Sequence, residues 1–208
     1  MRGRFISIEG GEAVGKSTQI QLLADWLRGQ GHSVEVTREP GGTDSAEAIR
    51  SLLLEGGADR WNARSEALLF AAARADHVAR RIRPAIDAGG WVISDRFIDS
   101  SRAYQGIAGG LGDAAILDLH RFGSGGFLPD CTLLLELPAD EAARRATRRD
   151  GVASDRIGGR DAAYHEAVAQ AFRSFAAAEP ARFRLVDASG DAASVHDRIV
   201  QAIAHMAA

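Results

Sequence analysis

The stretch from Gly10 to Ser17 constrains the fold of this chain more than any other part of the sequence. It satisfies the spacing G-x-x-x-x-G-K-[ST] of a phosphate-binding loop. The loop follows an apolar run, Phe5–Glu9, which indicates a buried strand, and it leads into a predicted helix, Ser17–Gln30. Glycines between a strand and a helix let backbone N–H groups wrap round a polyphosphate at the positive end of the helix. The sequence therefore predicts a nucleoside triphosphate site.

Two side chains of this loop carry the chemistry. Lys16 can reach the β- and γ-phosphates, and the hydroxyl of Ser17 can bind Mg²⁺. The competing interpretation is a chance glycine-rich turn with an exposed lysine. The strand before the loop and the helix after it favour the phosphate site.

Size and charge indicate one globular domain. The 208 residues carry 25 Lys and Arg against 28 Asp and Glu, and the net charge is −3, which suggests neither a nucleic-acid nor a membrane partner. The only cysteine, Cys131, cannot form an intrachain disulfide, which fits the reducing cytoplasm. The N-terminal strand is too short for a signal-peptide core, and no apolar run reaches the ~20 residues of a transmembrane helix.

Strand-like runs alternate with helical patterns along the whole chain. The predicted strands are Phe5–Glu9, Val34–Thr37, Trp91–Ser94, Cys131–Leu137 and Arg184–Asp187. We expect one helix capped by Asp44 or Ser45 and a longer one, capped by Asn62, that reaches towards Ala88. This alternation predicts an α/β fold with a doubly wound, five-stranded parallel sheet, in which ligands bind beyond the carboxyl ends of the strands.

Polar residues follow the second and third predicted strands. Arg38–Thr43 forms a proline- and glycine-containing loop, for which a simple turn is the alternative interpretation. Asp95, directly after the third strand, could hold Mg²⁺ through water, and Arg96 could bind a phosphate with its forked donors. On the longer helix, Phe70 and Arg74 share a face and could stack on and hydrogen-bond a flat base, although a core Phe beside a peripheral Arg would look the same.

The region 144–160 is rich in arginine and contains a glycine-bearing loop. Its arginines are Arg144, Arg145, Arg148, Arg149, Arg156 and Arg160. A solvated basic helix face is the usual explanation for such a run. Beside a triphosphate, an arginine-rich closing lid is favoured, because phosphoryl transfer needs cations and the exclusion of water.

Taken together, these motifs resemble those of the thymidylate kinase (dTMP kinase) family. The likeness covers essentially the whole chain and consists of Phe5–Gly10 with Lys16–Gln19, Arg38–Thr43, Asp95–Phe97, Tyr104–Gly106 and the arginine-rich lid. It implies a single P-loop nucleoside monophosphate kinase domain, 1–208, with the lid at about 144–160. It also implies a transferase of nucleotide biosynthesis that moves the γ-phosphoryl group of ATP to dTMP with Mg²⁺. The implied enzyme is a cytoplasmic homodimer that makes dTDP for dTTP synthesis.

The resemblance also implies a set of site residues. Those implied for ATP are Gly10, Gly11, Glu12, Ala13, Val14, Gly15, Lys16, Ser17 and Thr18. Those implied for dTMP are Glu12, Arg38, Pro40, Phe70, Arg74, Arg96, Ser100, Ser101, Tyr104 and Gln105. Those implied for the metal are Ser17 and Asp95, and those implied for catalysis are Lys16, Arg96, Arg149 and Arg156.

Individual roles follow from the same resemblance. Glu12 would accept a hydrogen bond from the dTMP 3′-hydroxyl, and Arg96 would bind the acceptor phosphate. Phe70 would stack on thymine, Arg74 would bond to its exocyclic oxygen, and Ser100 or Ser101 would face the base. Tyr104 would pack under the sugar where a 2′-hydroxyl would project.

The transferring arginine divides the family into two groups. Because Ala13 stands at the loop position where some members carry this arginine, the chain resembles the bacterial group that carries it in the lid. Arg149 is the first candidate and Arg156 the second. The chain departs from the family at Gly158-Gly159, where an acidic residue is common.

Two other functions fit the phosphate loop. A P-loop kinase with a different monophosphate acceptor would share the fold and differ in the acceptor pocket. A regulatory switch driven by hydrolysis would need a guanine-recognition Asn-Lys-x-Asp, and this tetrapeptide does not occur in the sequence.

Overall fold

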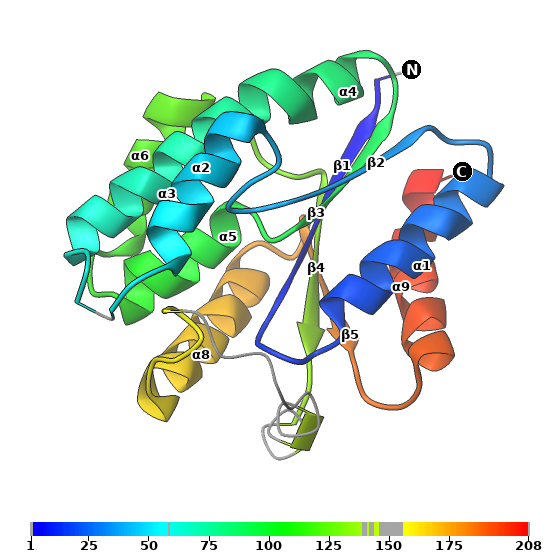
Figure 1. Cartoon of the computed structure of the whole chain (residues 1–208). Helices are drawn as coiled ribbons and strands as arrows, with labels where there is room; N and C mark the ends of the chain where they lie inside the picture. Colours follow the sequence, from blue (N-terminus) through cyan, green and yellow to red (C-terminus); the bar gives the residue numbers. More distant parts are fainter. Residues whose placement is uncertain (1, 58, 139–140, 142–143, 146–155, 208) are drawn as a thin grey trace.

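The computed structural model describes residues 2–57, 59–138, 141, 144–145 and 156–207. Its centre is a parallel sheet of five strands in the order β2-β3-β1-β4-β5 (Figure 1). The strands are β1 (Arg4–Gly10), β2 (Val34–Arg38), β3 (Trp91–Asp95), β4 (Cys131–Glu136) and β5 (Phe183–Asp187). Because β2 and β3 lie on one side of β1 and β4 and β5 on the other, the winding reverses at β1, which is where such sheets bind ligands. The predicted doubly wound sheet is confirmed.

Helices cover both faces of this sheet. They are α1 (Lys16–Gly29), α2 (Asp44–Leu54), α3 (Ala63–His77), η1 (Val78–Ile82), α4 (Arg83–Asp87), α5 (Ile98–Ser101), η2 (Arg102–Ala108), α6 (Asp113–Ser124), α8 (Ala162–Ala178) and α9 (Ala192–Ala207). Figure 1 shows α1 and α9 together on one face, with α2, α3, α6 and α8 on the other.

Side chains of the turns decide where α2 and α3 begin. The Oγ1 atom of Thr43 accepts a hydrogen bond from the N–H of Ala46 at 3.2 Å, so Thr43 caps α2 and the expectation of Asp44 or Ser45 was wrong by one or two residues. The Oδ1 atom of Asn62 accepts from the N–H of Ser65 at 2.9 Å, as predicted for α3. Each side chain satisfies an N–H group that the first helical turn leaves without a partner.

The long helix predicted from Asn62 towards Ala88 consists of three joined segments. α3 passes into η1, a π-helical turn, and then into α4. Pro84 lies at the start of α4, where it lacks an N–H and its ring crowds the preceding turn. A widened turn just before the proline accommodates that crowding and keeps the helical stretch continuous.

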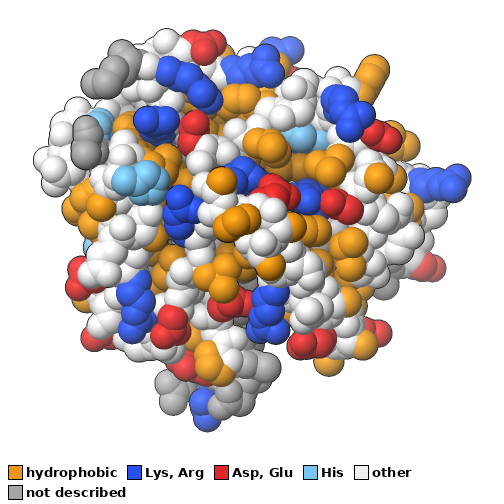
Figure 2. Space-filling model, turned by 180° about the vertical axis from the view of Figure 1, so that it is seen from behind, with side chains coloured by type: hydrophobic (Ala, Val, Ile, Leu, Met, Phe, Trp, Pro, Cys, Tyr) orange, Lys and Arg blue, Asp and Glu red, His pale blue; other side chains and the backbone are white. Residues whose placement is uncertain are grey.

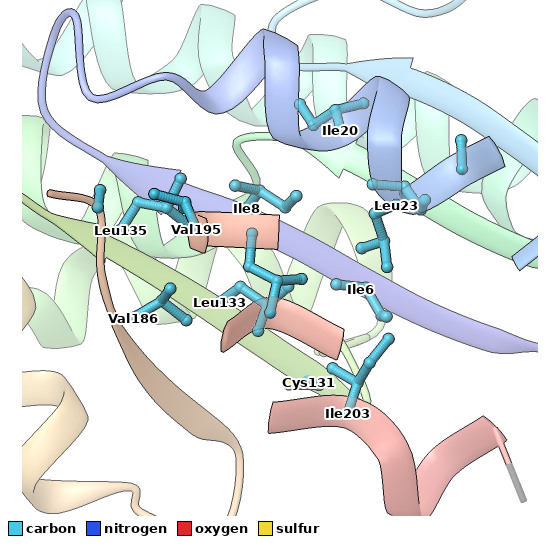
Figure 3. Close-up of a cluster of buried hydrophobic side chains, with 14 of the residues drawn as sticks. Ile6, Ile8, Ile20, Leu23, Cys131, Leu133, Leu135, Val186, Val195 and Ile203 are labelled. Carbon is cyan, nitrogen blue, oxygen red and sulfur yellow. The ribbon is translucent and has the colours of Figure 1, made fainter. Parts of the chain in front are cut away.

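Side chains of the strands alternate between two buried faces. Ile6 and Ile8 of β1 pack with Leu133 of β4 against α1 and α9, in the cluster of buried side chains shown in Figure 3. Phe5 packs on the opposite face against Phe97. Burial on both faces explains why the inner strands β1, β3 and β4 are largely apolar in the sequence, whereas the edge strands β2 and β5 contain charged residues and are only partly buried.

The face of the molecule shown in Figure 2 is of mixed character. On the face shown in Figure 2, Lys and Arg side chains lie beside Asp and Glu side chains rather than gathering into one basic patch. None of the helices that the structure describes is long and apolar enough to span a membrane.

Candidate active site at the carboxyl ends of the strands

A cavity of about 630 Å³ lies where β1, β2 and β3 end. It contains most of the residues that the sequence predicts for the site. Those that line it are Glu12, Ala13, Val14, Gly15, Lys16, Ser17, Thr18, Arg38, Pro40, Phe70, Arg74, Asp95, Arg96, Ser100, Ser101, Tyr104 and Gln105. Gly10, Gly11 and Arg156 are described but do not line it, and Arg149 lies outside the described residues.

The phosphate-binding loop has the predicted place between β1 and α1. A Cβ at Gly10 (φ 138°) would lie 2.5 Å from the carbonyl oxygen of Leu135 in β4, so only glycine fits there. Ala13 (φ 57°) and Gly15 (φ 93°) also have left-handed backbones that curve the loop back to α1. The loop and the first turn of α1 can therefore offer N–H donors and a positive dipole end to an anion.

Lys16 is folded onto its own loop. Its Nζ atom donates to the carbonyl oxygens of Gly11 at 2.7 Å and Gly10 at 3.2 Å. Burial, reinforced by the positive charge of Arg96, lowers the pKa of Lys16 to about 8. A nearby phosphate would favour the charged ammonium and raise this pKa again.

Arg96 lies between the phosphate loop and the rest of the cavity. Its φ of 68° is left-handed, which costs a non-glycine residue about 1–3 kcal/mol. In this conformation its Nη2 donates to Glu12 Oε1 at 3.2 Å and its Nη1 donates to Ser100 Oγ at 3.1 Å. Its guanidinium lies 5.1 Å from the centre of the Tyr104 ring. The strained backbone thus aims a forked cation into the cavity beside Glu12.

A buried carboxyl group, that of Glu9, supports the turn that carries Arg96. Its Oε1 accepts from the N–H of Phe97 at 2.7 Å, and its Oε2 accepts from Ser100 Oγ at 2.6 Å. Burial, reinforced by the nearby Asp99, raises the pKa of Glu9 to about 8. Glu9 therefore ties the end of β1 to the Arg96–Ser100 turn from beneath the cavity.

Asp95 and Ser17 fit a magnesium ion. The Oδ1 atom of Asp95 is buried and has no hydrogen-bond partner among the described residues, which leaves it available to a cation or its waters. Ser17 lines the same cavity. In the described part of the chain no three His, Cys, Asp or Glu side chains form a metal cluster. Mg²⁺ suits such a site because it is commonly held by one or two protein oxygens, waters and substrate phosphates.

The far end of the cavity is built round α3. Phe70 and Arg74 both line it from one face of the helix, in agreement with their spacing. Arg74 is almost fully buried: its Nε donates to Glu39 Oε2 at 2.7 Å and its Nη2 donates to Ser101 Oγ at 2.8 Å. The guanidinium is therefore fixed, with one edge on Glu39 and the other towards Ser101.

Glu39 is itself held from two sides. His77 Nδ1 lies 2.9 Å from Glu39 Oε1, and the other ring nitrogen lies 2.7 Å from Thr37 Oγ1. The loop around it has the predicted tight geometry, with a cis Glu39–Pro40 peptide bond. Arg38 at the start of this loop is exposed and paired with Glu47 at 3.0 Å.

Two predicted residues have partners outside the cavity. Gln105 Nε2 donates to Glu66 Oε1 at 2.9 Å, although the residue also lines the cavity. Arg156 Nη2 donates to Glu66 Oε2 at 2.6 Å, and the side chain of Arg156 is fully buried. In this structure Arg156 is therefore bound to Glu66 and does not line the cavity.

The sequence interpretation assigned no role to Glu9, Glu39, Glu66 or His77. For two of them, the position in the sequence could have indicated a structural role. Glu9 ends an otherwise apolar strand, and Glu66 lies four residues before Phe70 on the face of α3 that is turned to the cavity. Acidic residues at such positions need buried cationic or N–H partners. Arg145, Ile157 and Gly158 also line the cavity and were not singled out as site residues.

Comparison with known proteins agrees with this geometry. The model of the thymidylate kinase family matches residues 8–199. The thymidylate kinase of Rhizorhabdus wittichii is 61% identical and covers 99% of both chains, and that of Caulobacter vibrioides is 47% identical over 96% of this chain and 97% of its own. The crystal structure of thymidylate kinase from Ehrlichia chaffeensis superposes with a TM-score of 0.77 at 28% identity, over 97% of this chain and 98% of that one. The chain therefore belongs to the thymidylate kinase family.

Proposed function

We propose that this kinase transfers the γ-phosphoryl group of ATP to dTMP, giving dTDP and ADP. The observation that carries the proposal is the composition of one cavity, which has a phosphate loop at one end and the Phe70–Arg74 pair at the other. Arg96 lies between the two ends, where the phosphates of two nucleotides would meet. A donor and an acceptor held in one cavity in this way gain most of their rate from positioning and charge stabilisation.

The donor end holds ATP. The loop N–H groups and Lys16 bind the β- and γ-phosphates, and the phosphates displace the carbonyl contacts that Lys16 now makes. Mg²⁺, held by Ser17 and through Asp95, supplies positive charge to the phosphate oxygens when it is bound.

The acceptor end holds dTMP. Phe70 stacks on thymine, Arg74 bonds to its exocyclic oxygen, and Ser100 or Ser101 faces the base. Arg96 binds the acceptor phosphate, while Glu12, which is half-exposed beside it, accepts from the 3′-hydroxyl. Arg38, Pro40 and Gln105 complete the walls of this end.

A lid arginine stabilises the charge of the transferred group. Arg149 is the candidate, because Arg156 is bound to Glu66. Arg149→Ala should lower kcat far more than it raises the KM for dTMP, because such a contact matures only in the transition state. A change in the KM for dTMP alone would move this role to another lid arginine.

A coupled assay with ATP and a panel of nucleoside monophosphates tests the function. We expect dTMP to be phosphorylated with the highest kcat/KM. A different preferred acceptor would identify a related monophosphate kinase. Hydrolysis of the triphosphate without any acceptor preference would favour a regulatory switch.

The enzyme works as a homodimer in the cytoplasm. Leu68 on α3 and Phe122 on α6 are large apolar side chains that are 55% and 96% exposed, and the two helices pack side by side. Exposed apolar side chains on two packed helices suit contact with a second copy. Phe122→Asp should convert dimer to monomer in light scattering, and an unchanged mass would place the interface elsewhere.

A further inference from the structure

A buried ion cluster lies behind the acceptor end of the cavity. Its centre is Glu66 in the first turn of α3, which is 2% exposed. Arg156 Nη2 donates to Oε2 at 2.6 Å, and Arg160 Nη2 donates to Oε2 at 2.8 Å and to Oε1 at 3.1 Å. Gln105 of η2 adds a fourth hydrogen bond, at 2.9 Å to Oε1. One carboxylate thus joins α3 to η2 and to the segment Arg156–Arg160.

This cluster anchors a piece of the cavity wall. Ile157 and Gly158 directly follow Arg156 and line the cavity. Ile157 packs in the same apolar cluster as Phe70 and Tyr104, two residues of the acceptor end. Arg156 strengthens the attachment, since its Nε donates to the carbonyl oxygen of Leu53 at 2.9 Å.

The two guanidinium groups that bind Glu66 lie on either side of the wall residues. Arg156 precedes Ile157 and Gly158, and Arg160 follows them, while His165 Nε2 lies 3.2 Å from the carbonyl oxygen of Gly158. A buried carboxylate with two guanidinium partners is also an interdependent unit, because removing one charge leaves the others desolvated and poorly compensated. Loss of the Glu66 charge would therefore weaken the attachment on both sides of Ile157 and Gly158.

We propose that Glu66 is a positioning residue for the acceptor nucleotide, which holds Gln105 and the segment Arg156–Arg160 in place so that Ile157 and Gly158 complete the wall round the base and sugar. The inference rests on the proposed function. It assigns Arg156 and the side-chain amide of Gln105 to this support, and it leaves the phosphate loop unaffected.

Glu66→Gln tests the proposal because it keeps the size of the side chain and removes its charge. The new amide N–H₂ would face guanidinium donors, so the segment should detach. We expect the KM for dTMP to rise about tenfold, as for the loss of a remote supporting contact, while the KM for ATP stays within about twofold. Trypsin should also cut after Arg156, whose side chain is fully buried in the wild type.

Glu55→Gln is the matched control, because Glu55 is exposed at the end of α2 and should change neither KM nor cutting. Equal rises in both KM values, or a folded Glu66→Gln protein with a wild-type KM for dTMP and no new cut, would overturn the proposal.

If Glu66→Gln fails to fold, Arg156→Met serves instead. It leaves Glu66 paired with Arg160 and Gln105, and the same rise confined to the KM for dTMP is expected; its absence overturns the proposal too. A wild-type enzyme inactive on dTMP would refute the function and leave the cutting test intact.

Discussion

The two ends of the cavity are built by different means. The donor end is built mainly from one contiguous segment, in which residues 12–18 line the cavity and the loop N–H groups face it. The acceptor end consists of side chains from separate elements, held by buried ion pairs such as Arg74–Glu39, in which each side chain is 3% exposed. A backbone site needs only the local conformation of its loop, whereas a side-chain site also needs every supporting partner in place.

This difference predicts how each end fails. At the donor end, loss of a charge should reduce catalysis and leave the fold intact, because Lys16 is half-buried and, among the described residues, hydrogen-bonds only to its own loop. At the acceptor end, loss of a buried charge should reduce stability and acceptor binding together, because the charged partner remains desolvated.

Lys16→Met should have the largest effect of the substitutions that separate the two ends. It keeps the length of the side chain and removes the positive charge that would face the phosphates. The value of kcat should therefore fall ~10²–10³-fold, which corresponds to about 3–4 kcal/mol of transition-state stabilisation. The free energy of unfolding without nucleotide should stay close to the wild-type value. Steady-state kinetics at saturating ATP and urea unfolding measure the two quantities, and near-normal turnover would refute the phosphate-loop assignment.

Glu39→Gln, unlike Lys16→Met, should reduce stability and acceptor binding. It leaves Arg74 buried without its counter-charge, so the free energy of unfolding should fall by about 3 kcal/mol and the KM for dTMP should rise. The control is Glu136→Gln, which breaks a partly exposed pair with Arg173 and should cost less than about 1 kcal/mol. Similar losses in the two variants would mean that the acceptor end does not depend on its buried pair.

Glu9 connects the two ends, and its titration gives a pH test. Its folded pKa of about 8 exceeds the ordinary 4.5, so the folded state holds an extra proton between these values. The stabilisation that this proton contributes is fully present below pH 4.5. It decreases as the pH rises towards 8, by up to about 1.4 kcal/mol per pH unit, and is lost above pH 8. The difference in unfolding free energy between the wild type and Glu9→Gln should follow this slope from pH 6 to 8. A constant difference would show that Glu9 is ionised throughout.

Of the effects on kinetics, that of Tyr104→Ala should be the smallest, because it concerns only discrimination at the sugar. An added 2′-hydroxyl against the Tyr104 ring would clash and lack a partner, so wild type should discriminate between UMP and dUMP by about tenfold. The thymine methyl group is worth about 0.8 kcal/mol, or fourfold, between dTMP and dUMP. In the Tyr104→Ala variant, the ratio of kcat/KM between dUMP and UMP should be smaller than in the wild type, and the KM for ATP should be unchanged. Measurement of kcat/KM for dTMP, dUMP and UMP decides this, and an unaltered sugar ratio would contradict the role of Tyr104.

Sequence interpretation worked best where function depends on neighbouring residues. The strand before Gly10, the helix after Gly15 and the shared face of Phe70 and Arg74 all follow from local spacing. It worked less well at helix starts, where Thr43 rather than Asp44 or Ser45 makes the capping bond. Several cap-forming residues lie in a row there, and only the path of the chain selects one of them.

The sequence by itself determined the alternating α/β fold, the phosphate loop and the membership of the family that its motifs resemble. Only the tertiary structure decided how the buried charges are paired. Glu66 lies 90 residues from Arg156 and 39 from Gln105, and no local pattern indicates which carboxylate a distant guanidinium or amide will meet. Local backbone conformation follows from steric rules that act over a few residues. Ion pairing inside a protein depends on which surfaces the folded chain buries together.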